Sequence, residues 1–519
     1  MGEIRTVEIV DMNEDGVGIA KLSDGMVVFV PDTVAGEQAE IEIIERKKRF
    51  ANAKCLNLIH ISPERIDPLC PDTGTCGGCS LAHVSFDLEN RIKANAVRAA
   101  LRRNGLGQVA VEETLSSGTR RGYRNKMSVR FDTEAKIFGY SEASGTAILP
   151  FHECSLCPDV FGAIVRFANE RGEKLSSLLP SVLEIRSGTD GITVLMECAA
   201  RAAAFDGFAQ ELRRAFPEIC QVLAAPFDAD ERPVLRDRIA GFDLLFSVRA
   251  FRQVNTPMFE KLLELVISLA GEKPFSSAVD LYCGSGIIGL ALARAFPDAA
   301  LYGVEINPDA VEDARRNAAA NGVGNITFFA GDAATFRSHL KNDNIPSLLV
   351  VDPPRAGLST GMRREILELA PERMIYVSCN PQTLARDLAE LCAAGYSVRR
   401  VVPVNLFPAT RHVETVCLLS KLESQPHIEV KLNMSELDLT KAEKKATYQE
   451  IKDYVMEHTG LKVSSLYIAQ VKEKCGIIER ENYNKPKSPG AKQAKCPPEK
   501  EKAIRDALRH FGMIAKGTS

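Results

Sequence analysis

No apolar run in this 519-residue sequence approaches the roughly 20 residues that a membrane-spanning helix requires. The first residues, Met1 to Glu8, also contain no apolar core of the kind found in signal peptides. These two absences favour a cytoplasmic protein without a membrane partner. The sequence likewise shows no internal repeat at the periods of solenoid proteins. Its length is too great for a single hydrophobic core, so we expect about three or four domains.

A strong net charge of either sign is absent as well. With 65 basic and 68 acidic side chains the formal charge is -3, which excludes a uniformly basic nucleic-acid-binding protein but allows local basic patches. Lysine and arginine do cluster, at residues 46–49, 120–126 and 441–445. In a cytoplasmic protein, the 14 cysteines are expected to be metal ligands, nucleophiles or buried apolar residues rather than disulfides.

The first 59 residues have the pattern of a small β-barrel. Short runs rich in β-branched residues are separated by glycine and proline. Several short strands in so few residues are typical of an OB-like barrel. The stretches 16–20, 28–31 and 36–37 resemble the TRAM domain, and this resemblance implies that residues 1–59 bind RNA.

The remaining sequence divides into three parts. Residues 60–250 are rich in cysteine and glycine at their start and then mix strands and helices; their predicted amphipathic helix at 86–104 is a candidate to pack on the next domain. Residues 251–422 alternate strands and helices, the pattern of a parallel, doubly wound sheet. After a linker at 423–426, residues 427–519 form a predicted helical extension. For this extension, RNA contact and plain helical packing are equally good interpretations.

A glycine-rich turn follows the first strand of the alternating region. Residues 278–282 have the pattern of a strand, and Cys283-Gly-Ser-Gly286 precedes an apolar helix. The two glycines permit a tight turn and a close approach of a ligand to the backbone, and the helix N-terminus offers free N–H groups to an anionic group. The same spacing also matches a dinucleotide-binding fingerprint, which by itself is a weak signal.

Acidic residues on successive strands sharpen this interpretation. Asp280 lies in the first strand, beside the glycine turn. Glu305 ends the second strand, where a carboxylate can accept both ribose hydroxyls, and Asp332 follows the third, where it can face the adenine. The series resembles that of S-adenosylmethionine (SAM) methyltransferases more closely than that of NAD-binding enzymes.

The next two strands bring reactive groups to the same edge of the predicted sheet, where ligands bind in such folds. Asp352 ends a buried strand and is followed by two prolines and Arg355. Cys379 comes directly after the next strand and precedes a helix. Because a helix N-terminus lowers the pKa of a thiol, we expect Cys379 to be a reactive thiolate rather than a core cysteine.

A thiolate is useful to a methyltransferase whose target carbon is a poor nucleophile, such as C5 of uracil. Attack of the thiolate on C6 gives an enolate that makes C5 nucleophilic, and a base must then remove the C5 proton so that the thiol can leave. A carboxylate is therefore required near the nucleophile. Glu414, just before the last predicted strand, supplies one, and His412 is assigned only a supporting role.

Five ordered motifs carry a resemblance to the RNA 5-methyluridine methyltransferases, which extends over residues 1–422. They are Phe251-x-Gln-x-Asn255, Asp280-Leu-Tyr-Cys-Gly-x-Gly286, Asp352-Pro-Pro-Arg355, Ser378-Cys-Asn-Pro381 and Phe407-Pro-x-Thr-x-His-Val-Glu414. The expected fold class is therefore α/β. A Rossmann-like class I SAM methyltransferase domain is joined to an N-terminal TRAM barrel, an α+β central domain and an α-helical C-terminal extension.

The resemblance implies SAM-dependent methylation of uracil C5 in RNA, through a covalent Cys379–C6 adduct and with Glu414 as the base. The residues expected at the SAM site, of which the last also lies beside the target uracil, are Gln253, Tyr282, Gly284, Glu305, Asp332 and Asp352. The substrate implied is large-subunit (23S) ribosomal RNA, with transfer RNA as the alternative. No obligate protein partner is evident, and we expect a monomer.

Three cysteines, Cys70, Cys76 and Cys79, have the spacing C-x5-C-x2-C, and Cys154 and Cys157 are rival candidates for a fourth thiol. The spacing differs from that of zinc knuckles and from the C-x3-C-x2-C of radical-SAM enzymes. The two glycines between the last pair leave backbone N–H groups free to point at sulfur, which favours an iron–sulfur cluster over zinc. The resembling family carries a 4Fe-4S cluster on this pattern, which implies Cys154 as the fourth ligand and a structural role.

The basic run Arg121-Gly-Tyr123-Arg124-Asn-Lys126 is predicted to hold RNA phosphate while the tyrosine stacks on an unstacked base; a solvated charged edge is the alternative. Three other activities are disfavoured. Cytosine-5 methylation usually needs a second cysteine near Asp-Pro-Pro, where position 355 is arginine. The cysteine spacing argues against a TRAM-bearing radical-SAM enzyme. The presence of both Cys379 and Glu414 argues against a catalytically silent RNA-binding module.

Overall fold

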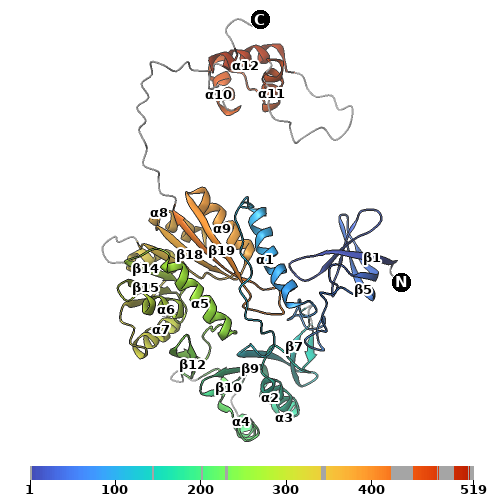
Figure 1. Ribbon diagram of the computed structural model, residues 1–519, viewed down its shortest axis with the longest axis vertical. Helices are drawn as coiled ribbons and strands as arrows, with labels where there is room; N and C mark the ends of the chain where they lie inside the picture. The colour runs from blue at the N-terminus through green and yellow to red at the C-terminus, as the bar shows by residue number, and fades with distance from the viewer. Residues whose placement is uncertain are drawn as a thin grey trace. The chain divides into compact units, whose positions relative to one another are not determined.

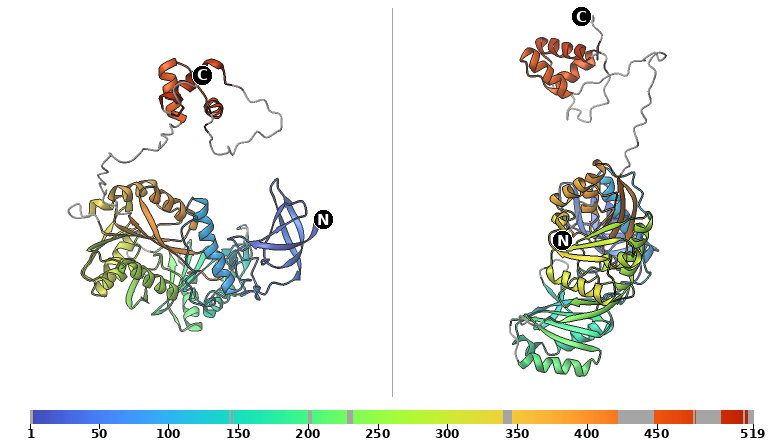
Figure 2. Two further views of the ribbon diagram at one scale, coloured as in Figure 1. Left: turned by 45° about the horizontal axis from the view of Figure 1, so that its top comes forward. Right: turned by 90° about the vertical axis from the view of Figure 1, so that its left-hand side faces the viewer.

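The computed structural model describes residues 3–142, 145, 147–199, 203–227, 232–339, 346–421, 448–475, 477, 496–511 and 513–514. The chain forms two compact units, residues 1–423 and 424–519, and each is described by itself (Figures 1 and 2). In the part of the chain just given, no helix is long and apolar enough to cross a membrane.

The N-terminal strands close into a barrel with the order β1-β2-β3-β5-β4, as the sequence predicted. They are β1 (Glu3–Met12), β2 (Gly18–Lys21), β3 (Val27–Val30), β4 (Gln38–Arg46) and β5 (Phe50–His60). Alternate side chains point inward, so that Val7, Ile9 and Ile41 are buried. Gly18 leaves no room for a side chain, because a Cβ there would lie 2.0 Å from Thr33 Oγ1.

The central region contains a six-stranded sheet with the order β11-β10-β9-β6-β7-β8. Its strands are β6 (Lys126–Asp132), β7 (Ile137–Ser141), β8 (Ile148–Pro150), β9 (Pro180–Gly188), β10 (Gly191–Cys198) and β11 (Ile219–Ala225). Its helices are α2 (Asp159–Asn169), α3 (Gly172–Ser176) and α4 (Ala203–Ala215), and a hairpin of β12 (Val234–Ile239) and β13 (Phe242–Ser247) follows. Phe138, Phe161 and Phe208 are buried in one core with residues of the sheet, which confirms the α+β prediction.

The residues that follow the hairpin form a seven-stranded sheet with the order β16-β15-β14-β17-β18-β20-β19. Its strands are β14 (Ser277–Leu281), β15 (Ala300–Glu305), β16 (Ile326–Ala330), β17 (Leu348–Val351), β18 (Arg373–Ser378), β19 (Tyr396–Val404) and β20 (Glu414–Lys421). Its helices are α5 (Thr256–Gly271), α6 (Ile287–Ala295), α7 (Pro308–Ala320), η1 (Ala333–His339), α8 (Thr360–Leu369) and α9 (Pro381–Ala393). Successive residues of β17 belong alternately to two apolar cores, which lie on opposite faces of the sheet.

One strand of this sheet departs from the purely parallel arrangement that the sequence predicted. β20 runs antiparallel to both of its neighbours, β18 and β19. The physical reason is the connection: residues 405–413 form a loop between β19 and β20 rather than a crossover helix, and only antiparallel strands can be joined so directly. As a result, the first residue of β20 lies at the edge of the sheet where β18 ends.

Helix α1 (Phe86–Arg103) precedes the six-stranded sheet in sequence but packs on the seven-stranded sheet, against α9 and β19 (Figure 1). The hydroxyl of Ser85 caps the helix by accepting a hydrogen bond from the Leu88 N–H, at 3.1 Å. Val97 and Leu101 are buried in the core on that side of the sheet. Helix α1 therefore lies between the barrel and the six-stranded sheet in sequence but packs on one face of the seven-stranded sheet.

In its described residues, the C-terminal unit contains three helices, α10 (Tyr448–Thr459), α11 (Ser465–Lys474) and α12 (Pro498–His510). Val455, Ile468 and Ile504 are buried in a small apolar core that all three share. The helical extension is thus confirmed where it is described. The predicted linker at 423–426 and the proline- and lysine-rich segment up to residue 495 lie outside the described residues.

Candidate active site

All of the predicted cofactor residues except Gln253 follow or end strands at one edge of the seven-stranded sheet. Strands β14, β15, β16, β17 and β18 are parallel, and Leu281 pairs in register with Val304 on one side and Val351 on the other. Parallel strands in register end at the same edge. The positions that follow or end these strands therefore lie side by side, at Tyr282, Gly284, Glu305, Asp332, Asp352 and Cys379.

The turn after β14 is built on unusual backbone angles. Tyr282, Gly284 and Gly286 have φ values of 63°, 53° and 82°, a left-handed region in which only glycine is unstrained. A Cβ at Gly286 would lie 2.7 Å from the ring of Phe328, so this position cannot take a larger residue without a shift. The backbone N–H of Gly284 donates to a carboxylate oxygen of Glu305 at 3.1 Å. This contact joins the glycine turn to the acid at the end of β15, as expected for a nucleotide site.

Two buried polar atoms at this turn, Asp280 Oδ1 and Ser285 Oγ, have no protein partner among the described residues, and the side-chain oxygen of Gln253, on the segment before α5, has none either. The other oxygen of Asp280 accepts from the Gly289 N–H at 2.8 Å. Burial raises the pKa of Asp280 to about 8, although the Gly289 hydrogen bond opposes the rise. Unpaired buried polar atoms are costly, and they fit the charged amino-acid end of SAM, whose ammonium and carboxylate need such partners. Ser285 was missed as a site residue, although its position between two glycines was a signal.

Two further predicted residues, Asp332 and Tyr282, follow the ends of β16 and β14. Asp332 is exposed, and one of its carboxylate oxygens accepts a hydrogen bond from the Ala334 N–H at 2.9 Å. Tyr282 is half-buried, and burial raises the pKa of its hydroxyl to about 12. Ile306, directly after Glu305, is 71% exposed, which is unusual for a large aliphatic residue. These groups form an edge suited to a nucleoside, with one apolar face and several acceptors.

The nucleophile candidate opens into a small cavity of about 190 Å³, which is lined by Glu14, Asp15, Ala96, Arg355, Cys379, Asn380, Pro381, Gln382, Arg411, His412 and Val413. Cys379 follows β18, and Asn380 caps α9 by accepting from the Gln382 N–H at 3.0 Å. The N-terminal barrel contributes to the wall, because Asp15 forms an ion pair with Arg411 at 2.6 Å. The barrel, helix α1 and the methyltransferase sheet therefore meet at this cavity.

Glu414 lies at the edge of the sheet where β18 ends, because β20 runs antiparallel to β18. It is the first residue of β20, and the next residue, Thr415, pairs with Ser378 at the end of β18. Glu414 is only 4% exposed, and burial together with the nearby carboxylate of Asp352 raises its pKa. Burial also raises the pKa of Asp352. Two carboxylates with raised pKa values near a thiol can act as general bases close to neutral pH.

The expected lowering of the Cys379 pKa is wrong. Burial raises the pKa of this thiol to about 11, and the carboxylates of Glu414 and Asp352 add to the rise. The positive charge of Arg355 opposes this rise. Among the described residues, only the backbone carbonyl of Arg355 has hydrogen-bond partners, and its guanidinium forms no ion pair. The favourable effect of the α9 N-terminus is therefore outweighed by lost solvation and two neighbouring negative charges.

His412 lines the same cavity and is half-buried. Burial lowers its pKa to about 4, and the neighbouring cations Arg355 and Arg411 lower it further. A neutral imidazole at physiological pH can donate or accept one hydrogen bond but carries no charge. This supports a binding or structural role for His412 rather than a role as the principal base.

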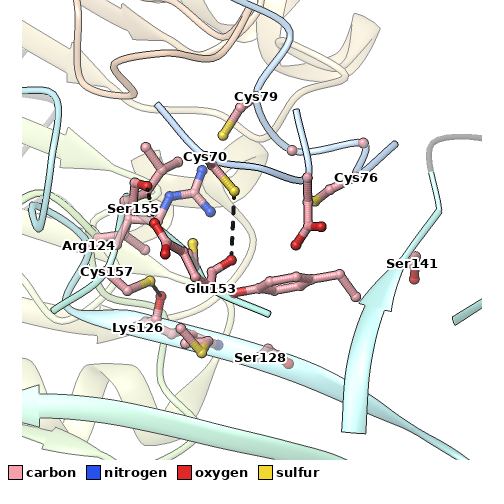
Figure 3. A pocket seen from close by; sticks show the side chains of 18 of the residues that line it. Cys70, Cys76, Cys79, Arg124, Lys126, Ser128, Ser141, Glu153, Ser155 and Cys157 are labelled. Atoms are coloured by element: carbon pink, nitrogen blue, oxygen red, sulfur yellow. Dashed lines mark hydrogen bonds between the residues drawn. The ribbon is translucent and has the colours of Figure 1, made fainter. Parts of the chain in front are cut away.

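The predicted cluster cysteines line a second, larger cavity of about 890 Å³ in the central region (Figure 3). Cys70, Cys76, Cys79 and Cys154 all contribute to it, and so does the rival ligand Cys157. The thiol of Cys70 donates to the Glu153 carbonyl at 3.7 Å. Within the described residues, no three His, Cys, Asp or Glu side chains are grouped so that they could hold a metal ion. The donor set thus fits an iron–sulfur cluster in its chemistry and its shared cavity, whereas the described thiols are not grouped around a single metal ion.

The two candidates for the fourth thiol differ in their electrostatic surroundings. The adjacent Cys157 lowers the pKa of Cys154 to about 6, whereas the interaction with Cys154 raises the pKa of Cys157. Cys157 donates to the Lys126 carbonyl at 3.8 Å (Figure 3). Metal ligation needs a thiolate, so the chemistry of the pair favours Cys154.

The prediction that Tyr123 stacks on an RNA base is wrong. Tyr123 is only 8% exposed, and its hydroxyl donates to the Pro408 carbonyl at 3.0 Å. Asn125 of the same run donates to the Gln253 carbonyl at 2.9 Å. Residues 121–126 therefore connect the central region to the segment before α5 and to the loop before β20. Arg121 is the basic residue of this run that is exposed to solvent.

Comparisons with known proteins agree with this geometry. The family model described as tRNA (Uracil-5-)-methyltransferase matches residues 236–422, and the TRAM domain model matches residues 1–56. An uncharacterized RNA methyltransferase of Halalkalibacterium halodurans is 32% identical over 446 residues, which cover 80% of this chain and 97% of the relative. A second uncharacterized RNA methyltransferase, from Chlorobaculum tepidum, is 30% identical over 471 residues, covering 81% of this chain and 97% of the relative.

Among solved structures, the crystal structure of Pyrococcus abyssi tRNA (uracil-54, C5)-methyltransferase in complex with S-adenosyl-L-homocysteine is similar to this chain. The two share 25% sequence identity with a TM-score of 0.60, and the match covers 80% of this chain and 100% of the other. The match extends well beyond the seven-stranded sheet, since it includes most of the first unit of the chain.

Proposed function

Because this chain belongs to the RNA (uracil-5-)-methyltransferase family, whose members use SAM, we propose that it methylates C5 of a uridine in 23S ribosomal RNA through a covalent adduct at Cys379. One observation carries the proposed chemistry. A thiol at the end of β18 and a buried carboxylate at the start of the antiparallel β20 share the edge of the sheet that holds the SAM-binding turn.

Each proposed step has a group of suitable chemistry at this edge. The sulfur of Cys379 forms a bond to C6, and the electrons of the C5–C6 double bond move onto the C4 carbonyl oxygen. SAM, when bound, supplies the methyl group that C5 takes. Glu414 then removes the C5 proton, the C5–C6 double bond forms again, and the C6–S bond breaks to release Cys379.

The raised pKa of Cys379 adds a requirement to this sequence of steps. Because the thiol is mostly protonated at neutral pH, its proton must pass to a base as the C–S bond forms. Asp352 is suited to this task, since burial raises its pKa and leaves Glu414 free for the C5 proton. The Asp352 proton returns to the thiolate on release, and the Glu414 proton passes to water.

Two other substrates are alternatives. The similarity to a Pyrococcus abyssi tRNA (uracil-54, C5)-methyltransferase favours transfer RNA as the second candidate. A cytosine-5 activity is less favoured, because position 355 is arginine and none of the described residues adds a second thiol to the cavity of Cys379. The barrel wall beside Cys379 supports a substrate larger than a free nucleotide, since Glu14 and Asp15 lie at the same cavity.

Deleting the gene is expected to remove 5-methyluridine from one position of 23S ribosomal RNA and to leave transfer RNA unchanged. Mass spectrometry of nuclease digests from wild-type and deletion strains measures both RNAs in one experiment. Re-expression of the wild-type chain, but not of the Cys379→Ala variant, should restore the methyl group. Loss of 5-methyluridine from transfer RNA instead would make transfer RNA the substrate.

We also propose that Cys70, Cys76, Cys79 and Cys154 bind a 4Fe-4S cluster that shapes the central region. The shared cavity and the low pKa of Cys154 support this ligand set. Four thiolates are the usual ligands of such a cluster, and its electron-transfer chemistry is not needed for methyl transfer.

Protein purified without oxygen is expected to contain about four iron atoms and four sulfides per chain, as four-cysteine ligation implies. Elemental analysis and the visible absorption spectrum measure this content. Cys154→Ser should lower the iron content, whereas the matched change Cys220→Ser, at an exposed position of β11, should not. Zinc without iron in the wild-type protein would contradict the assignment.

A further inference from the structure

The loop between β19 and β20, residues 405–413, leads directly to Glu414, and other segments of the chain hold its backbone. Four consecutive carbonyls, at residues 406–409, each accept a hydrogen bond from a different segment. The donors are Asn255 to Leu406 at 3.0 Å, Lys93 to Phe407 at 2.9 Å, Tyr123 to Pro408 at 3.0 Å, and the Leu81 N–H to Ala409 at 3.0 Å. We call this set of four bonds the loop clamp.

Lys93 and Glu89 of helix α1 lie at the centre of the loop clamp. Their side chains are fully buried and form an ion pair at 2.9 Å. The Lys93 ammonium also donates to the side-chain oxygen of Asn405 at 2.5 Å. The Glu89 carboxylate accepts from the Asn405 amide at 2.8 Å and from the Ala409 N–H at 2.9 Å. The pair therefore holds both ends of residues 405–409.

A third charge completes this buried group. Arg120 lies 2.9 Å from the second oxygen of Glu89, and it donates to the backbone carbonyls of Leu81 and Val84. Burial lowers the pKa of Lys93 to about 8, which shows that the site disfavours its charge. Removing three charges from water costs free energy that well-packed apolar residues would avoid. Stability alone is therefore a weak explanation for this group.

The residues after the loop clamp have direct access to the reaction centre. Arg411, His412 and Val413 line the cavity of Cys379, and Glu414 pairs in register with Val404. Ala409 has a φ of 66°, a strained angle for a residue with a side chain, so the loop does not take this path by local preference. Contacts from α1 are therefore needed to hold Glu414 in its position.

Resting on the proposed function, we propose that Lys93 and Glu89 are positioning residues for methyl transfer. Through the loop clamp they hold Glu414 and the cavity wall at 411–413 in the geometry that removal of the C5 proton requires. Cys379 and the SAM-binding turn are held by other strands, so they keep their places when the loop shifts. Loss of the clamp should therefore slow release of the adduct more than its formation.

Lys93→Met tests this, because methionine is similar in length but cannot donate to the loop. We expect turnover to fall by about tenfold to a hundredfold, the scale of a displacement of about 1 Å at a reacting group. SAM affinity should change little, and the fraction of protein held as adduct with RNA at steady state should rise. Lys174→Met, at an exposed position of α3, is the matched control and should keep full turnover.

Lys93→Leu is a second variant that guards against a folding defect specific to one side chain; like Lys93→Met it keeps the buried Glu89–Arg120 ion pair intact. Thermal denaturation measures whether each variant is folded. Any variant that is folded should show slower turnover and a larger fraction of adduct. Unchanged turnover, or a parallel fall of turnover, SAM affinity and adduct level, would overturn the positioning role. Failure of the proposed function would look different: the wild-type protein would form neither adduct nor 5-methyluridine.

Discussion

Cys379→Ala is expected to abolish methylation, lowering turnover by roughly 10⁴-fold or more, the scale on which loss of a covalent nucleophile acts. Among the residues that the structure describes, no other thiol lines the cavity, so no described neighbour can replace the sulfur. Loss of this half-buried thiol should change the fold little, and SAM affinity should be retained because the SAM-binding turn belongs to β14. Methyl transfer from labelled SAM to RNA measures the turnover, and calorimetry measures cofactor binding.

Cys392→Ala is the matched control, because Cys392 is half-buried on α9, the helix that begins just after Cys379. It should retain wild-type turnover. The alanine at 379 should also prevent any denaturation-resistant bond between protein and RNA. Turnover close to the wild-type value in Cys379→Ala would rule out covalent catalysis by this thiol.

Glu414→Gln is expected to trap the adduct, with turnover reduced by about 10²- to 10⁴-fold, the usual contribution of a general base. The amide has the size of the carboxyl group but cannot accept the C5 proton, so the C6–S bond cannot break. Because burial and Asp352 raise the pKa of Glu414, a neutral amide should cost little stability at this position. Denaturing electrophoresis with labelled RNA should show a protein–RNA species of increased mass.

Two controls separate this result from non-specific cross-linking. Glu368→Gln, on an exposed part of α8, should give neither a turnover defect nor an adduct. The double variant Cys379→Ala/Glu414→Gln should lose the adduct completely. If Glu414→Gln releases methylated RNA at the normal rate, another group is the base, and Asp352 is then the first candidate.

Cys379 and Glu414, the two proposed catalytic residues, illustrate what a sequence can and cannot predict. The strand before Cys379 and the helix after it are local patterns, so the sequence correctly placed the thiol at the edge of a sheet. The pKa of that thiol depends on groups brought close by other strands, and the expected direction of its shift was wrong. Charge effects of this kind depend on burial and distance, which a sequence does not contain.

Tyr123 gives a second example. A tyrosine among basic residues is a reasonable candidate for stacking on a base, and nothing local indicates that it is buried. Its partner, the Pro408 carbonyl, lies 285 positions away in sequence. The role of Lys93 was hidden for the same reason, since its loop partners are more than 300 positions distant.

By itself, the sequence determined the barrel, the alternating strands and helices, the glycine turn and the acids that follow successive strands. These features arise from periodicity and backbone preferences within short segments, and such local preferences act wherever the segment lies. Only the tertiary structure decided that β20 runs antiparallel to β18. For this reason Glu414, the first residue of β20, lies beside the end of β18. Tertiary structure also decided that helix α1 packs against α9 and β19 and contacts the loop before β20. Both depend on packing between segments far apart in the chain, and the pairing of a thiol with a base is a property of that packing.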